Sequence, residues 1–401
     1  MNNLILPAWP LQLNDTMYLA LALVFSGLAG EVMKRVVRLP RVCGYALAGL
    51  LLGPLMFGWF GAHNIGSLRI FIDLALALLL FELGNRVDLC WFRLNPWIIP
   101  SSIAEAGLTF IGTYTVLRLF DATPGFAATV AAIAISTSPA VVMRVAAELR
   151  AEGQVTQRLY VLTALNVLYS VVLSKLIMGY LHGAFHHDWS SAIFHPVYLL
   201  LGSLFMGGLI ALAFRLLRRW SDLSNEQAVV ILFGLLLLSL SLLQALMLPT
   251  MLAPLLAGVM VKNSDRRPLN WPHHFGTAGG VLVILLFILT GATLTANAMI
   301  TGGVAALAVI AVRLFGKGIG VAVFGPVSGL SLRQSFALGV ALMPMSALAF
   351  LLVDDISTLY PEFGAQVGGI VLSMVAILQL VGPIGVQWAL RFCNESIERG
   401  K

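Results

Sequence analysis

The chain has 401 residues, of which 59% are hydrophobic and only 10% are charged, with a formal net charge of +6. A soluble domain would carry about a quarter charged residues, so this composition excludes an ordinary soluble protein. The loops of a membrane protein explain the basic excess, and we expect no nucleic-acid partner. The mean hydropathy of +0.93 predicts an all-α integral membrane protein.

Apolar runs of about 20 residues follow one another along the chain and predict a single transmembrane domain over residues 1–401. No basic region precedes the first run, so we expect no cleaved signal peptide. We predict about 13 transmembrane helices, at 16–36, 42–60, 66–86, 95–118, 123–146, 157–181, 196–216, 226–246, 249–262, 276–297, 302–326, 334–354 and 364–390.

The basic residues fall mostly on one side of this series of spans. If the N-terminus lies outside, most of the 24 Lys and Arg residues occupy cytoplasmic loops and ends, and the outer side keeps Arg69 and Arg118. Such enrichment marks the cytoplasmic side of membrane proteins. We therefore expect the N-terminus outside and the C-terminus in the cytoplasm. The short loops and the lack of a transit peptide suit a bacterial inner membrane.

Two spans carry helix-breaking residues near their middle. The segment AAIAISTSPAVVMRV in the fifth span contains Thr137, Ser138 and Pro139, and FALGVALMPMSALAFLL in the twelfth contains Pro344 and Ser346. A proline lacks the backbone N–H and frees a carbonyl that lipid cannot satisfy. For a single proline, a kinked helix repaired by its neighbours would be sufficient explanation.

The spacing of the two breaks predicts an internal symmetry. The two spans lie seven apart in the series, and an odd offset gives them opposite directions. This pattern is typical of inverted repeats with two discontinuous helices that cross at the membrane midplane, where transporters bind substrate. We expect a first repeat at about 42–181, a linking helix at about 196–216 and a second repeat at about 226–390.

An amide and an ammonium group occur in the sixth span, VLTALNVLYSVVLSK, which contains no acid. With a rise of about 1.5 Å per residue, Asn166 lies near the middle of the bilayer. Lys175 lies close enough to the outer face to extend its amine to the interface, and we interpret it as an interfacial anchor.

Two further cations lie deep in the eleventh span, AVIAVRLFGKGIGV, where Arg313 and Lys317 share one helix face. A charge at the bilayer centre costs about 2.5–3.5 kcal/mol, so each should face a partner or a cavity. Glu105 is the most central carboxylate, and Glu82 lies about one turn from the cytoplasmic surface. Glu105 could bind protons or cations during transport, or could neutralise the cations permanently; the sequence leaves both open.

Several segments resemble monovalent cation:proton antiporters of the Kef-like and NapA-like sodium/hydrogen exchanger type. These segments are GYALAGLLLGP (44–54), LLLFELGNRVDL (78–89), ISTSPAVV and the region 316–352. The resemblance covers nearly the whole chain and implies a 13-helix antiporter fold, a homodimer, and exchange of Na⁺ or K⁺ for H⁺ by alternating access. It implies no cofactor, metal or catalytic residue.

The chain departs from the family pattern where the resemblance places the essential carboxylate. The helix after the first break usually reads DDVLAVV or QDIAAIP, whereas this chain has LNVLYSVV, with Asn166 at that place. An amide oxygen can bind a cation but cannot carry a proton. The second break has MPMSA without the family's acid, and we expect no nucleotide-binding domain after the last span. Arg313 or Lys317 corresponds to the family's penultimate-helix cation.

These departures leave alternatives open. Thr137, Ser138, Asn166 and Ser346 would also suit uniport or transport of an organic solute, and a non-transporting sensor or scaffold is possible on the same fold. A pH sensor or metal site among the outer His182, His186, His187 and His195 is less favoured than a solvated loop. The three cysteines are far apart and odd in number, which argues against a disulfide framework and a metal site. An intramembrane enzyme is less favoured, because the sequence has no HExxH-like motif and no histidine deep in a predicted span. The glycines of GKGIG are interpreted as packing positions.

Overall fold

The computed structural model describes residues 15–58, 62–186, 189–220, 225–264, 275–294, 296–345 and 347–397. The regular secondary structure of these residues is helical throughout, with sixteen α-helices and one short π-helix. Ser346, one of the predicted site residues, and His187 lie outside the described residues.

The helices confirm the predicted series of spans. They are α1 (Asp15–Val32), η1 (Met33–Val37), α2 (Arg41–Leu52), α3 (Ala62–Gly84), α4 (Leu89–Leu94), α5 (Ile98–Leu119), α6 (Pro124–Ile135), α7 (Pro139–Leu149), α8 (Gln154–His186), α9 (Trp189–Trp220), α10 (Asn225–Ala245), α11 (Leu252–Ser264), α12 (Phe275–Ala292), α13 (Ala296–Phe324), α14 (Leu332–Ala341), α15 (Ala347–Leu359) and α16 (Pro361–Phe392). If α6–α7 and α14–α15 each count as one broken rod and the short α4 is left aside, the described helices form thirteen rods.

Some boundaries differ from the prediction. The helix predicted at 42–60 ends at Leu52, because Gly53 and Pro54 follow and the chain turns there. The one predicted at 276–297 ends at Ala292. The short helix α11 is separate from α10, as predicted. Pro254 is compatible with α11 because it lies in the first turn, where the missing N–H would have no partner within the helix.

Six segments are long and apolar enough to cross a membrane by length and composition, and they are Thr16–Val37, Pro124–Leu149, Gln154–Ala184, Phe194–Leu217, Gly302–Phe324 and Pro361–Phe392. Shorter apolar helices run beside them, including α2, most of α10 and most of α12. The chain is thus a multi-pass membrane protein, since these helices belong to one packed bundle.

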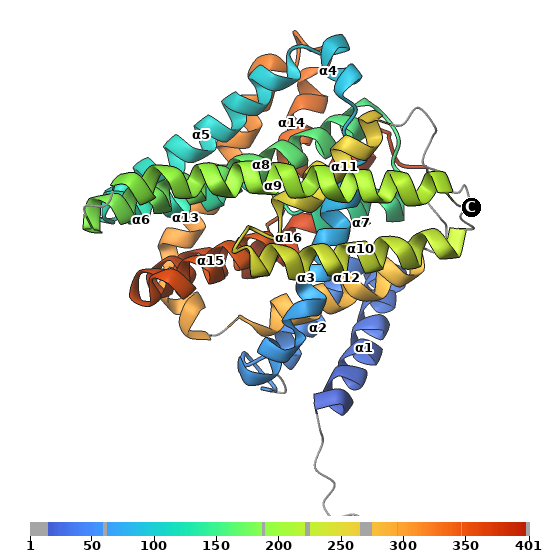
Figure 1. The fold of residues 1–401 in the computed structure, drawn as a ribbon, viewed down its shortest axis with the longest axis horizontal. Helices are drawn as coiled ribbons and strands as arrows, with labels where there is room; N and C mark the ends of the chain where they lie inside the picture. Colours follow the sequence, from blue (N-terminus) through green and yellow to red (C-terminus); the bar gives the residue numbers. More distant parts are fainter. Residues whose placement is uncertain are drawn as a thin grey trace, which may run out of the picture.

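The helices pack as two groups joined by α9. The first, here called the core group, contains α5, α6, α7, α8, α13, α14, α15 and α16. The second, the support group, contains α1, α2, α3, α10, α11 and α12. Helix α9 packs on α8 of the core group and on α10 and α11 of the support group. Figure 1 shows α9 running along the molecule, with α5 and α14 on one side of it and α1, α2 and α12 on the other.

The first break follows directly from its local sequence. Helix α6 ends at Ile135, and Pro139 opens α7, where its missing N–H is not needed. Ser138 caps α7, since its Oγ accepts a hydrogen bond of 3.3 Å from the Val141 N–H. The second break separates α14, which ends at Ala341, from α15, and it contains Pro344. Both interruptions confirm the two predicted discontinuous helices.

Close packing of α13 on α5 brings the charged residues of these two helices together. A Cβ on Gly320 would lie 2.3 Å from the Cα of Glu105, and one on Gly316 would lie 2.9 Å from the backbone N of Thr109. These contacts confirm two of the three glycines of GKGIG, Gly316 and Gly320, as packing positions, because only a residue without a side chain permits this approach.

We expect Gly320→Ala to force α13 away from α5 and to destabilise the fold by about 1–3 kcal/mol or more, because the added methyl group meets backbone. Gly318→Ala is the matched control, since a Cβ at Gly318 has nothing within 4 Å. Thermal unfolding in detergent measures both variants. Equal midpoints would contradict the close α5–α13 packing.

Candidate functional site

The two broken helices meet at their interruptions. The Ser138 N–H donates a hydrogen bond of 2.8 Å to the carbonyl of Pro344. The Thr137 hydroxyl donates one of 2.9 Å to the carbonyl of Leu342. The stretch from Ser136 to Ser138 is fully buried. The breaks therefore cross and bond to one another inside the bundle, and we call this place the crossing.

Lys317 on α13 lies at the crossing with all its donors used. Its Nζ lies 3.1 Å from Oε2 of Glu105, 2.9 Å from the carbonyl of Ile135 and 3.3 Å from Oγ1 of Thr137. An ammonium group has three N–H donors, so these contacts saturate it. Lys317 and Glu105 are both 0% exposed. Of the two cations that the sequence offered to Glu105, Lys317 is the one that forms a buried ion pair with it.

Arg313, one turn earlier on α13, meets backbone rather than an acid. Its Nη2 donates to the carbonyls of Ser136 and Met343, at 3.2 and 3.1 Å. These carbonyls belong to the ends of α6 and α14, where a broken helix leaves its acceptors unpaired and carries a partial negative charge. Arg313 and Lys317 therefore compensate the two carboxyl-terminal helix ends that meet at the crossing.

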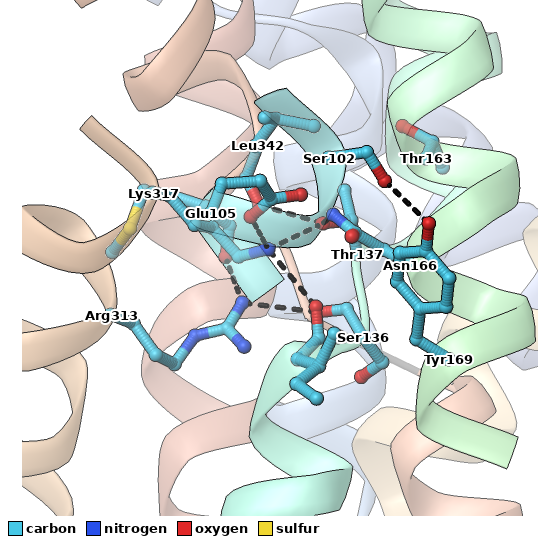
Figure 2. Close-up of polar contacts among 12 residues, drawn as sticks. Ser102, Glu105, Ser136, Thr137, Thr163, Asn166, Tyr169, Arg313, Lys317 and Leu342 are labelled. Carbon is cyan, nitrogen blue, oxygen red and sulfur yellow. Dashed lines mark hydrogen bonds and ion pairs between the residues drawn. The ribbon is translucent and has the colours of Figure 1, made fainter. Parts of the chain in front are cut away.

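Asn166 reaches the same place from α8. Its Nδ2 donates a hydrogen bond of 3.2 Å to Oγ1 of Thr137. The Thr137 hydroxyl thus accepts from Asn166 and Lys317 while it donates to Leu342, which uses its full capacity. Figure 2 shows Glu105 of α5, Lys317 of α13 and Asn166 of α8 turned toward Thr137 in the first break.

Two oxygens at the crossing remain without a hydrogen bond among the described residues. They are Oε1 of Glu105 and Oδ1 of Asn166, and both are buried. A buried acceptor without a partner is costly, and such groups mark sites where another species binds. Carboxylate and amide oxygens are the ligand type that hard cations prefer. The crossing therefore offers a cation two free oxygens beside the Thr137 hydroxyl.

The other predicted residues lie elsewhere. Glu82 makes its ion pair with Arg86, in the turn that follows α3, at 3.6 Å, and not with Arg313 or Lys317. Lys175 is bound at 2.9 Å by Asp355 of α15, an acid that the sequence did not pair with it.

Two sets of contacts at or beside the crossing were not predicted from the sequence. The acceptors of Arg313 are backbone carbonyls, and only the positions of the breaks could have pointed to them. A further hydrogen bond of 2.9 Å joins the hydroxyl of Ser102 on α5 to that of Tyr169 on α8 beside the crossing (Figure 2). Nothing in the spacing of these two residues indicated that contact.

Two broken helices that cross within a bundle of membrane-length helices define a transporter of the alternating-access class. The family model for the transmembrane sodium/hydrogen exchanger matches residues 20–392, and the chain belongs to this family. No curated protein matches the sequence.

Two solved structures of the sodium proton antiporter MjNhaP1 from Methanocaldococcus jannaschii share the fold. The structure at pH 8 has 17% sequence identity and a TM-score of 0.74, covering 95% of this chain and 98% of that one. A structure from a three-dimensional electron-microscopy map of the same protein has 18% identity and a TM-score of 0.75, covering 96% of this chain and 98% of that one. At such identities the similarity shows the fold, which confirms the predicted antiporter architecture.

Proposed function

We propose that this chain exchanges a monovalent cation, Na⁺ or K⁺, for a proton by alternating access, and that it acts as a transporter and not as an enzyme. Its family supports this function. The observation that carries the proposal is the pair of buried, unbonded oxygens at the crossing, Oε1 of Glu105 and Oδ1 of Asn166. They lie beside an ion pair that a cation can disrupt.

The exchange follows from competition for one carboxylate. With Lys317 charged, its ammonium group holds Oε2 of Glu105 at 3.1 Å and neutralises it. A cation that binds to Glu105 replaces that positive charge, and Lys317 then loses its proton, since two positive charges beside a single buried carboxylate are strongly disfavoured. Return of the proton to Lys317 expels the cation. Each turnover thus exchanges one species for the other.

Asn166 has a different part in this proposal, because an amide binds a cation without carrying a proton. We expect Asn166→Leu to raise the KM for the cation about tenfold, the cost of one ligand oxygen, while exchange stays coupled to protons. The dependence of exchange on cation concentration in proteoliposomes measures this. Ser170→Ala, one turn further along α8 and bonded only weakly to the carbonyl of Ile133 at 3.5 Å, is the control. An unchanged KM in Asn166→Leu would remove Asn166 from the site.

Alternating access requires contacts between the two groups of helices that can open at either end. At the end where α3 begins, Arg69 of the support group pairs with Asp354 of the core group at 2.5 Å. At the end where α7 finishes, Glu148 of the core group lies 3.4 Å from Lys34 and accepts a 3.0 Å hydrogen bond from the Arg41 N–H. Polar contacts of this kind can break and re-form as the groups move.

We also propose the arrangement in the membrane. The chain comprises two inverted repeats, at about 42–181 and 226–390, joined by the linking helix at 196–216, and the core group of crossed broken helices moves against the support group in a homodimer. The N-terminus lies outside and the C-terminus in the cytoplasm of a bacterial inner membrane. The distribution of Lys and Arg supports this orientation. The exposed apolar side chains of α1, such as Val24 and Leu28, supply a face for lipid or for a second copy.

Proteoliposomes with an acidic interior test the function. Addition of Na⁺, K⁺ or Li⁺ outside should make the interior more alkaline, relative to protein-free liposomes. Folded protein that responds to none of these cations would overturn the proposal. It would favour transport of an organic solute or a non-transporting role, for which the missing acid in α8 is the supporting observation.

A further inference from the structure

A cavity separate from the crossing opens where the end of α8 meets the start of α9. Its volume is about 460 Å³, and its walls come from α8, α9, α15 and the turn at Tyr360. This volume lies within the range of about 300–1,000 Å³ that is typical of small-molecule sites. The cavity is large enough for a ligand and lies between the helix that links the two groups and two helices of the core group.

The polar groups of this cavity offer more donors than acceptors. Lys175 donates one hydrogen bond, to Asp355 at 2.9 Å, which leaves two of its N–H groups for a ligand. The neighbouring Ser174 is 2% exposed, and its hydroxyl has no hydrogen-bond partner among the described residues. His195 adds an imidazole from α9. Asp355, already paired, is the one carboxylate in the lining.

The rest of the lining is apolar. Met178, Leu352 and Ile356 cover the core side, and Phe194 and Tyr198 cover the α9 side. Phe194 is 72% exposed and Tyr198 47% exposed, so the cavity opens past these aromatic rings toward the lipid-facing surface of α9. The Tyr198 hydroxyl donates a hydrogen bond of 2.8 Å to the carbonyl of Leu246, so Tyr198 contributes its apolar ring to the cavity wall.

We propose that this cavity binds an anionic amphiphile, with its carboxylate or phosphate head on Lys175 and Ser174 and its apolar body between Leu352 and Phe194. Free N–H and O–H donors at one end favour a negative head, because charge-assisted hydrogen bonds to oxyanions are the strong ones. The apolar walls and the lateral opening fit a hydrocarbon chain. The head can belong to a free acid or to a phospholipid.

The site would connect parts of the molecule that the proposed transport cycle moves. A ligand held by Lys175 of α8 also touches α9 through Phe194 and His195. Its binding therefore favours the arrangement of core group and linking helix seen here, whether or not the chain exchanges cations for protons.

Thermal unfolding of the purified full chain in non-ionic detergent tests the site with decanoate, decanol and decylamine. Of the three compounds, we expect only decanoate to raise the midpoint of thermal unfolding, and its effect should saturate. Lys175→Met should weaken decanoate binding about tenfold or more, since a hydrogen bond to a charged group is lost. Asp355→Asn should strengthen it, because Lys175 is released from its partner. If Lys175 and Asp355 formed only a structural ion pair, the two substitutions would change the effect of decanoate on the unfolding midpoint in the same direction. Lys34→Met, at the other end of the bundle, is the control.

The source of the head group is distinguished by native mass spectrometry with short-chain phosphatidylglycerol and phosphatidylcholine. Retention of phosphatidylglycerol, lost in Lys175→Met, identifies a lipid site; retention of decanoate alone identifies a free acid. Equal effects of decanoate, decanol and decylamine, or equal decanoate binding by wild type and Lys175→Met, would overturn the proposal.

Discussion

Glu105→Gln is expected to abolish proton-coupled exchange and leave the protein folded. The substitution is nearly isosteric, and the amide oxygen can still accept a hydrogen bond from Lys317, which lies 3.1 Å from the carboxylate. The amide, however, carries no negative charge. It can therefore neither attract a cation nor be the carboxylate for which a cation and the protonated lysine compete.

The measurement is the rate of cation-driven pH change in proteoliposomes, which should fall to that of protein-free liposomes. Glu82→Gln is the matched control. Glu82 is also a membrane-embedded glutamate, but it pairs with Arg86 and not with the crossing. We expect this variant to retain exchange. If Glu105→Gln exchanged cations at the wild-type rate, Glu105 would be a permanent structural partner of Lys317 and the transport site would lie elsewhere.

Lys317→Met should destabilise the protein strongly and also end exchange. Removal of one partner of a buried ion pair leaves the other charge uncompensated and costs about 3–5 kcal/mol. Here the loss would also remove the Lys317 hydrogen bond to the carbonyl of Ile135 and leave the Thr137 hydroxyl with Asn166 as its donor. Thermal unfolding in detergent, followed at one pH, measures the change.

The double variant Glu105→Leu/Lys317→Met separates stability from transport. Replacement of a whole buried pair by apolar groups of similar volume is often neutral. We therefore expect most of the lost stability to return while exchange stays absent. A single Lys317→Met variant as stable as the wild type would show that the lysine does not hold the crossing together.

The fold was predictable because its determinants are local. The length of each apolar run indicates a span, and the sequences around Pro139 and Pro344 indicate the two breaks. The odd spacing of the two breaks then predicts their opposite directions. The predicted helix 42–60 was too long because its apolar run continues past Gly53 and Pro54, where the helix ends.

The site was predictable in part, for a related reason. Depth along a helix placed Glu105, Asn166 and Lys317 near one level, but depth says nothing about which side chain faces which. The glycines at 316 and 320 bring α13 onto α5, and this contact selects Glu105 for Lys317. Arg313 was expected to face a partner or a cavity, and its partners are backbone carbonyls that only the folded breaks bring together.

If a cation and a proton compete for the Glu105–Lys317 pair, binding of the cation must release protons into the solution. Purified protein in a weakly buffered solution with a pH dye is titrated with Na⁺ and K⁺, and cation binding is followed in parallel by calorimetry. The wild type should release protons in proportion to the cation bound, and Glu105→Gln should release none. Cation binding without proton release, or equal release by Glu105→Gln, would contradict it.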